Sequence, residues 1–199
     1  MFSTSRKFDF PPELKFSDQT NVQITSEKTL LGVIITDDLK WKRNTEYIVS
    51  KARRKIWILR RLLHLDLSIF DLFNVYTKEI RSLLEFAVPV WHSSLTRKQS
   101  TSIEAVQKLA FRIILRNRYT DYFHACATFE TETLEQRGHK VCINFAKKNV
   151  KSEHCLFTFP THTVNLRQRK QKVNEFKFNT RRFQRSSLPF LASLLNSNM

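Results

Sequence analysis

One stretch of the sequence, residues 41–63, constrains the fold most, because it has the pattern of a long amphipathic helix. At helical spacing its apolar side chains fall on a single face: Ile48, Ala52, Ile56, Leu59, Leu62 and Leu63. Four arginines and a tryptophan fall on the opposite face: Arg53, Arg54, Trp57, Arg60 and Arg61. Lys51 and Lys55 flank the apolar face, which their aliphatic stems can cover. Such a helix needs a hydrophobic core on one side and presents concentrated positive charge on the other.

The charge of this helix has two interpretations. In the first, the charged face is simply solvated, and Trp57 packs beneath a neighbouring helix, which is the role favoured for this side chain. In the second, the face binds an anion. The chain has a net charge of +16 and a pI near 10.1. Residues 41–118 hold 16 basic against 6 acidic residues, and residues 161–199 hold 8 against 1. This uneven excess favours a surface that binds a polyanion.

A second amphipathic helix is expected over residues 68–87. It opens with a capping box of Ser68 with Asp71. Its apolar face comprises Phe73, Tyr76, Ile80, Leu83, Leu84 and Ala87. Arg81 and Glu85, four residues apart, are expected on its solvent-exposed side.

A third helix is expected over residues 96–115, with a capping box of Thr96 with Gln99 at its start. Its inward positions are Ile103, Val106, Ala110, Ile113 and Ile114. A second basic row with a spacing of four residues comprises Lys108, Arg112 and Arg116. Three consecutive amphipathic helices with short links predict a small bundle.

The remaining segments are less regular. Short strands are expected at residues 14–16, 21–25 and 30–36, which are β-branched or aromatic and separated by turn residues such as Ser26-Glu27. A short helix is expected over residues 119–128.

A longer helix is expected over residues 133–150, with Leu134, Val141, Cys142 and Phe145 facing inward. Gly138 in its middle costs about 1 kcal/mol relative to alanine. Residues 161–185 form a basic tail, in which Arg181 and Arg182 lie among phenylalanines, and residues 187–195 are expected to dock as a terminal helix.

The predicted fold is therefore mainly α, an amphipathic helix bundle after two or three short strands. We divide the chain into strands at 1–40, a three-helix bundle at 41–118, further helices at 119–160 and a basic tail at 161–199.

Neither catalytic nor metal-binding residues are predicted. Asp37-Asp38 could in principle bind the metal ions of nucleotidyl transfer, but such sites need a third carboxylate, and the pair stands where a turn is expected. Each of the three cysteines has a histidine close by, at 124 and 126, 139 and 142, and 154 and 155. No Cys-x-x-Cys knuckle accompanies them, so buried free thiols are favoured over zinc ligands. The sequence also contains no serine in a glycine-flanked elbow, the anchor of many hydrolase sites.

No feature of the sequence predicts secretion or insertion into a membrane. The first thirty residues contain no apolar signal-peptide core, and the longest apolar run, residues 30–35, is too short to span a bilayer. An odd number of cysteines without secretory features indicates reduced thiols. We therefore expect an intracellular protein, in the cytoplasm or nucleus, with no membrane partner.

Several motifs follow one another along nearly the whole chain: FDFPPE at 8–13, LLGVIITDDLKW at 30–41, YIVSKAR at 47–53, LRR at 59–61, LEFAVPVW at 84–91, IEAVQK at 103–108 with RII at 112–114, LEQR at 134–137 with FAKK at 145–148, and SLPFL at 187–191. In combination they resemble the end of the reverse transcriptase of jockey-like non-LTR retrotransposons. There, a Leu-Gly hairpin follows the catalytic palm, and the resemblance implies the same hairpin within residues 1–40 of this chain. Gly138 departs from the charged residue that the family pattern implies at that position.

The resemblance implies the last palm strands, the thumb and the C-terminal tail of an RNA-directed DNA polymerase. It places Leu31, Gly32 and Val33 at a primer-grip-like turn, where a residue without Cβ lets the backbone approach nucleic acid. It implies that Lys51 and the four arginines of the first helix contact the phosphates of an RNA–DNA or DNA duplex. The further nucleic-acid-binding residues expected are Lys108, Arg112, Arg116, Arg181 and Arg182. Trp57 could stack on the nucleic acid or only pack, and packing is favoured.

The chain lacks the catalytic motif of the family that it resembles. The family's aromatic-x-Asp-Asp signature is absent, because Ile35-Thr36 precedes the only Asp-Asp pair. This chain alone is therefore expected to be no enzyme and to need no cofactor, although the parent polymerase would need Mg²⁺.

Three functional hypotheses remain open from the sequence. The first is a reverse transcriptase fragment that supplies duplex binding without catalysis. The second is a stand-alone, sequence-independent nucleic-acid-binding helical protein. The third is a helical bundle that docks a protein partner, with incidental charge.

Overall fold

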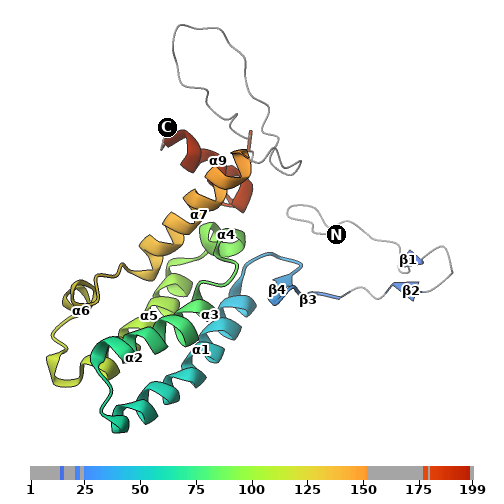
Figure 1. Ribbon diagram of the computed structural model, residues 1–199. Coiled ribbons are helices and arrows are strands. Elements are labelled where there is room, and N and C mark those ends of the chain that lie inside the picture. Colours follow the sequence, from blue (N-terminus) through green and yellow to red (C-terminus); the bar gives the residue numbers. More distant parts are fainter. Residues whose placement is uncertain (1–13, 16–20, 23–24, 152–176, 179, 198–199) are drawn as a thin grey trace, which may run out of the picture.

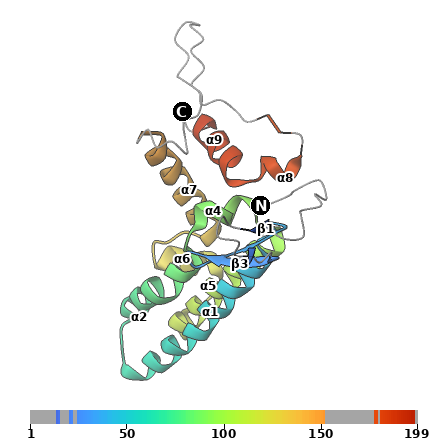
Figure 2. The same cartoon turned by 90° about the vertical axis from the view of Figure 1, so that its right-hand side faces the viewer.

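The computed structural model confirms a mainly helical chain with a small β element near its N-terminus (Figures 1 and 2). It describes residues 14–15, 21–22, 25–151, 177–178 and 180–197. Two short strands, β1 (Leu14–Lys15) and β2 (Asn21–Val22), pair antiparallel within two of the expected strand segments. Among the described residues, no helix is both long enough and apolar enough to cross a membrane.

The first long helix, α1, spans Lys42–Leu62 and follows Trp41, whose backbone is left-handed with a φ of 58°. Its predicted apolar face is confirmed, since Ile48, Ala52, Ile56 and Leu59 are buried. Leu62 and Leu63 are half-buried where the helix passes into a 3-10 turn, Leu63–Leu65. The helix therefore forms one wall of the core along its whole length.

The second arm of the bundle is less regular than expected. It consists of α2 (Ile69–Val75), a π-helical segment (Tyr76–Arg81) and α3 (Ser82–Leu84). Ser68 caps its start as predicted, since the Asp71 amide donates to the Ser68 hydroxyl at 3.1 Å. The arm ends at Ala87, which has a φ of 52°. The next short helix, α4 (Val88–Trp91), starts there with a proline in its first turn.

The third arm, α5 (Arg97–Leu115), has the capping box predicted for it. It runs parallel to α1, because each of its ends is tied to the matching end of that helix. At the start, Gln99 donates to the Lys40 carbonyl at 2.9 Å; at the end, Arg116 donates to the Leu63 carbonyl at 2.6 Å. Figure 1 shows α1, α2 and α5 side by side, as expected for a three-helix bundle.

The later helices build a second layer on this bundle. They are α6 (Tyr122–Thr128), α7 (Leu134–Lys151), α8 (Arg181–Gln184) and α9 (Ser187–Ser197). The terminal helix docks as predicted, with Leu191 and Leu195 buried, and it packs on α7 beyond the end of the bundle (Figure 2). In α7, Leu134 and Cys142 are buried as expected, but Phe145 is 39% exposed, so its predicted inward position is wrong.

A buried polar chain connects the bundle to the start of α7. Tyr76 donates to the Gln107 side-chain carbonyl at 2.5 Å, and the Gln107 amide donates to the Tyr122 hydroxyl at 2.8 Å. Tyr122 in turn donates to the Glu104 carboxylate. Glu104 accepts the backbone amides of Leu134 at 3.1 Å and Glu135 at 3.3 Å, two otherwise unpaired donors of the first turn of α7. The side chains of Tyr76, Gln107, Tyr122 and Glu104 therefore all have hydrogen-bond partners.

The N-terminal hairpin turns at the Leu-Gly pair, where the resemblance implies a turn. β3 (Glu27–Leu30) and β4 (Val33–Thr36) pair antiparallel, with Leu31 and Gly32 between them. The expected single strand over 30–36 is therefore wrong, and so is the turn expected at 26–27. Both turn residues have positive φ, 48° and 81°, which reverses the chain within two residues.

The hairpin is held against α1. The Ile34 amide donates to the buried Asn44 side chain at 3.1 Å, and Arg43 pairs with Glu27 at 2.8 Å. Because the strand pairing closes at Leu30 and Val33, the Ile34 amide points away from β3, and the helix supplies its acceptor.

Candidate nucleic-acid interface

The four arginines predicted to face solvent on α1 do so. All four side chains are exposed: Arg53, Arg54, Arg60 and Arg61. The two pairs are seven residues apart, which corresponds to about 10 Å along the helix axis. Within the described part of the chain, no acidic side chain pairs with any of them, and no hydrogen bond holds them. We call these four residues with Trp57 the α1 basic face.

An open groove runs along the first half of the α1 basic face. Its wall on α1 includes Ser50, Arg53 and Arg54, and Ser102 of α5 lies on its other side. Glu46 and Val49 complete the lining. The groove therefore offers two guanidinium groups and two hydroxyls, beside the single carboxylate of Glu46, to a ligand lying between the two parallel helices.

Trp57 lies in the open rather than beneath a neighbouring helix. Its side chain is 59% exposed, whereas Trp41 and Trp91 are only 8% and 2% exposed. The packing role favoured for Trp57 from the sequence is therefore wrong. Ala52, Ile56 and Leu59 are the buried residues of α1 nearest to Trp57, and they face the rest of the bundle. The indole therefore lies on the solvent side of the helix.

The two lysines of α1, Lys51 and Lys55, make side-chain contacts that the four arginines do not make. Lys55 pairs with Glu79 at 2.5 Å, across to the second arm. The Lys51 ammonium lies 5.7 Å from the centre of the Tyr47 ring, a cation–π distance on the same helix. Lys51 therefore remains exposed beside the α1 basic face, while Lys55 is neutralised by its partner.

The second basic row, on α5, is largely engaged in the fold. Lys108 lies 4.9 Å from the centre of the Tyr122 ring, and Arg112 lies 5.4 Å from that of Tyr119. Arg116 holds the Leu63 carbonyl at the end of α1. Arg112 and Arg116 stay exposed, but a ligand would have to compete with these internal contacts.

The basic tail is described only in part. Arg181 and Arg182 are exposed in α8, whose start is capped by Thr180. The basic residues at 167–172 and Phe176 lie outside the described residues. The structure therefore places four of the tail's cations in solvent: Lys177, Arg181, Arg182 and Arg185. Arg181 and Arg182 lie on a helix of one turn.

The hairpin tip corresponds to the predicted primer-grip-like turn. Leu31 is 87% exposed at the tip, but Val33 is buried in the core. A Cβ on Gly32 would lie 3.3 Å from the Phe86 ring, so the glycine allows both a left-handed turn and close contact with this ring. This contact gives the glycine a role within the fold, and the approach of nucleic acid implied by the resemblance stays a prediction.

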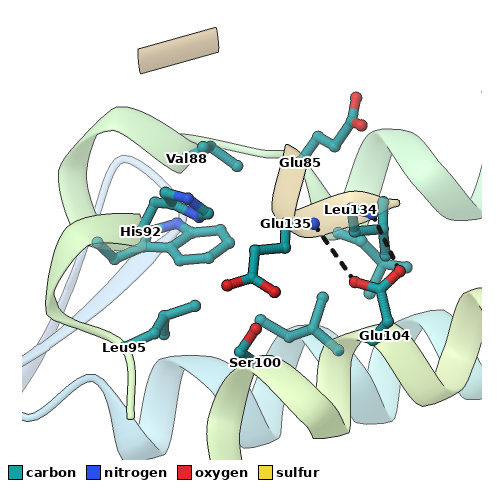
Figure 3. Close-up of a pocket in the computed structure, with 11 residues that line it drawn as sticks. Glu85, Val88, His92, Leu95, Ser100, Glu104, Leu134 and Glu135 are labelled. Carbon is teal, nitrogen blue, oxygen red and sulfur yellow. Dashed lines mark hydrogen bonds between the residues drawn. The ribbon is translucent and has the colours of Figure 1, made fainter. Parts of the chain in front are cut away.

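A small recess lies between α4, α5 and the start of α7, and sequence analysis missed it (Figure 3). His92, Glu104 and Glu135 line it, and its cavity volume of about 20 Å³ suffices for about one water molecule. Burial, helped by nearby His139, lowers the pKa of His92, so this imidazole is held neutral. Gly138 was the signal in the sequence, since a Cβ there would lie 2.6 Å from the His92 ring.

The candidate metal ligands that the structure describes do not gather into a metal site. Cys126 and Cys142 are buried thiols, and burial raises the pKa of Cys142 to about 11. Among the residues that the structure describes, no group of three or more His, Cys, Asp or Glu side chains could hold a metal ion. His154 and Cys155 lie outside those residues.

Asp37 and Asp38 do not fit the magnesium site of a polymerase. Desolvation raises the pKa of Asp38, but hydrogen bonds from Lys40 and Thr36 outweigh it and lower the value to about 2. The Thr36 hydroxyl donates to the Asp38 carboxylate at 2.8 Å and the Lys40 amide donates to it at 3.2 Å. This carboxylate therefore stabilises the turn before α1, as the sequence predicted.

No protein-family model, no curated protein and no solved structure matches this chain. The α1 basic face must therefore be interpreted from its own geometry.

Proposed function

We propose that this chain is a sequence-independent nucleic-acid-binding module whose α1 basic face contacts the phosphate backbone. One observation carries the proposal: four exposed arginines share one side of a long helix, and no acidic group among the described residues neutralises them. Arginine suits phosphate well, because its planar guanidinium can donate two parallel hydrogen bonds.

The opposite side of the same helix supports the proposal. The buried residues of α1 fix its position in the bundle, so the four guanidinium groups stand on a rigid element. A ligand can therefore contact them without the cost of ordering a loop. The groove beside Arg53 and Arg54 adds the hydroxyls of Ser50 and Ser102 as further donors to phosphate oxygens.

The family resemblance supplies a biological setting for this binding. In this setting, the chain is the thumb-containing part of a retrotransposon reverse transcriptase and holds the primer–template duplex. The alternative is a stand-alone nucleic-acid-binding protein. Both settings need the same α1 basic face, so one binding experiment tests their common part.

The test is to replace all four arginines with glutamine and titrate binding against salt. We expect binding to weaken by a similar factor on any sequence. Each lost phosphate contact flattens the slope of log affinity against log salt by about 0.9 on duplex DNA, so the slope should fall by about 3 to 4. The melting temperature should barely change, because the four side chains are exposed and unpaired.

A matched control removes the same charge elsewhere. Lys28, Lys78, Lys147 and Lys148 are exposed on other elements, and replacing them with glutamine lowers the net charge equally. A second variant replaces the basic residues of the tail: Arg167, Arg169, Lys170 and Lys172. Substitution is preferable to truncation, because removing the end of the chain would also remove α9 from the core.

The proposal fails if the α1 variant binds as the wild type does. Loss of binding in the tail variant alone would assign the interface to the tail. Absence of any binding at low salt would leave the protein-docking bundle as the function.

A further inference from the structure

The position of Trp57 is not explained by phosphate contacts alone. Arg53 and Arg54 lie one helical turn before it, and Arg60 and Arg61 lie one turn after it. The indole is exposed, and among the described residues no aromatic ring stacks on it and no cation lies over its face. A large apolar side chain is thus kept in water at the centre of an anion-binding surface.

A fully paired duplex offers little to such a side chain. Its bases are stacked inside, and a helix lying on its phosphates would press the indole against the sugar–phosphate backbone. Unpaired bases, by contrast, present flat apolar faces that stack on aromatic side chains. Surfaces that bind single strands without sequence preference combine such aromatic platforms with flanking positive charge, which is the arrangement on α1.

We propose that the α1 basic face binds single-stranded nucleic acid, with an unpaired base stacked on Trp57 and the flanking phosphates held by the two arginine pairs. This inference rests on the proposed function and narrows its ligand. The arginines supply affinity for any polynucleotide, and Trp57 supplies the preference for unpaired bases.

Binding of an oligothymidylate of about 15 nucleotides and of a blunt duplex of similar length tests the inference. Trp57→Ala should weaken binding to the oligothymidylate by about fivefold or more, the lower range for loss of one base–aromatic stack. Binding to the duplex should change by less than about twofold, because no base is available to stack. Trp57→Phe keeps an aromatic ring and should retain most of the affinity for the single strand.

Tryptophan fluorescence provides a second readout. Trp57 is the exposed tryptophan, while Trp41 and Trp91 are buried, so quenching by oligothymidylate should come from Trp57. In Trp57→Phe, which still binds, this quenching should disappear. Circular dichroism of each variant checks that the helices are intact.

The outcomes separate this inference from the proposed function. If the arginine variant loses binding but Trp57→Ala affects single strand and duplex equally, the phosphate-binding function stands and the stacking inference is wrong. Unquenched fluorescence in a bound wild-type complex also overturns the inference. If the arginine variant binds normally, the proposed function and the stacking inference both fail.

Discussion

At the scale of single residues, Gly138 sets how closely α7 approaches the corner formed by α4 and α5. A Cβ at this position would lie 2.6 Å from Cε1 and 2.7 Å from Nδ1 of His92. Glycine in a helix is unfavourable by about 1 kcal/mol relative to alanine, and here the close contact with the imidazole explains its presence.

The effect of alanine at Gly138 should depend on His92. In the wild type, Gly138→Ala should lower stability, because the half-buried imidazole must shift away from the new methyl group. In a His92→Ala background the space is free, and the same substitution should raise stability by up to about 1 kcal/mol through helix propensity. Chemical denaturation of the four proteins measures both effects. An equal effect of alanine in the two backgrounds would contradict this packing argument.

At the scale of elements, the β3–β4 hairpin depends on α1 for its position. Only two strands pair in it, and every residue of β3 is exposed. A two-stranded hairpin alone is marginally stable in water. The Asn44 side chain and the Arg43–Glu27 pair are the polar contacts that attach it to the helix.

Amide hydrogen exchange should show this dependence. We expect faster exchange in Glu27–Thr36 than in α1 and α5. Asn44→Ala leaves the Ile34 amide without its acceptor, which should cost about 1 to 3 kcal/mol and accelerate exchange at Ile34 selectively.

Lys42→Ala, an exposed change in the same turn of α1, serves as the control. Unchanged exchange at Ile34 in the Asn44 variant would show that another contact positions the hairpin. Equal protection of hairpin and helices in the wild type would show that the strands belong to a complete domain.

At the scale of the whole molecule, the chain presents its charge asymmetrically. The excess of basic residues lies in the bundle and the tail, while the segments 1–40 and 119–160 are nearly neutral. Within the bundle, Lys108, Arg112 and Arg116 contact the fold, and Arg53, Arg54, Arg60 and Arg61 of α1 have no acidic partner among the described residues. Exposed cations also lie on other elements, such as Lys28, Lys78, Lys147 and Lys148, but the four arginines of α1 are gathered on one face of one helix.

The chain alone should not extend a primer on any template, with Mg²⁺ or Mn²⁺. Its sequence contains a single Asp-Asp pair, and the Asp38 carboxylate is committed to the turn before α1. Two-metal nucleotidyl transfer needs several carboxylates free to bind the ions. A primer-extension assay with purified protein checks this expectation. Template-dependent incorporation that is lost when Asp37 and Asp38 are changed to alanine would overturn the assignment of this turn.

Local sequence was sufficient to predict the longer helices and two of the N-caps, whereas the caps at Asp121 and Thr180 were not predicted. The buried face of α1, the caps at Ser68 and Thr96, and the docked terminal helix follow from residues within a few positions of one another. Helical periodicity and capping act over one or two turns, so they are visible in the sequence. The position of the arginines on α1 follows from the same periodicity.

Contacts between distant segments were decided only by the tertiary structure. Glu85 was expected on an exposed face near Arg81, but Arg137 of α7 donates to it at 3.0 Å. Gln107 and Glu104 join elements more than fifteen residues apart, and Lys108, Arg112 and Arg116 find partners outside α5. Trp57 is exposed because the neighbouring arms leave that side of α1 uncovered. These contacts depend on which helices pack together and on the distance between them. The spacing of residues along one helix determines neither.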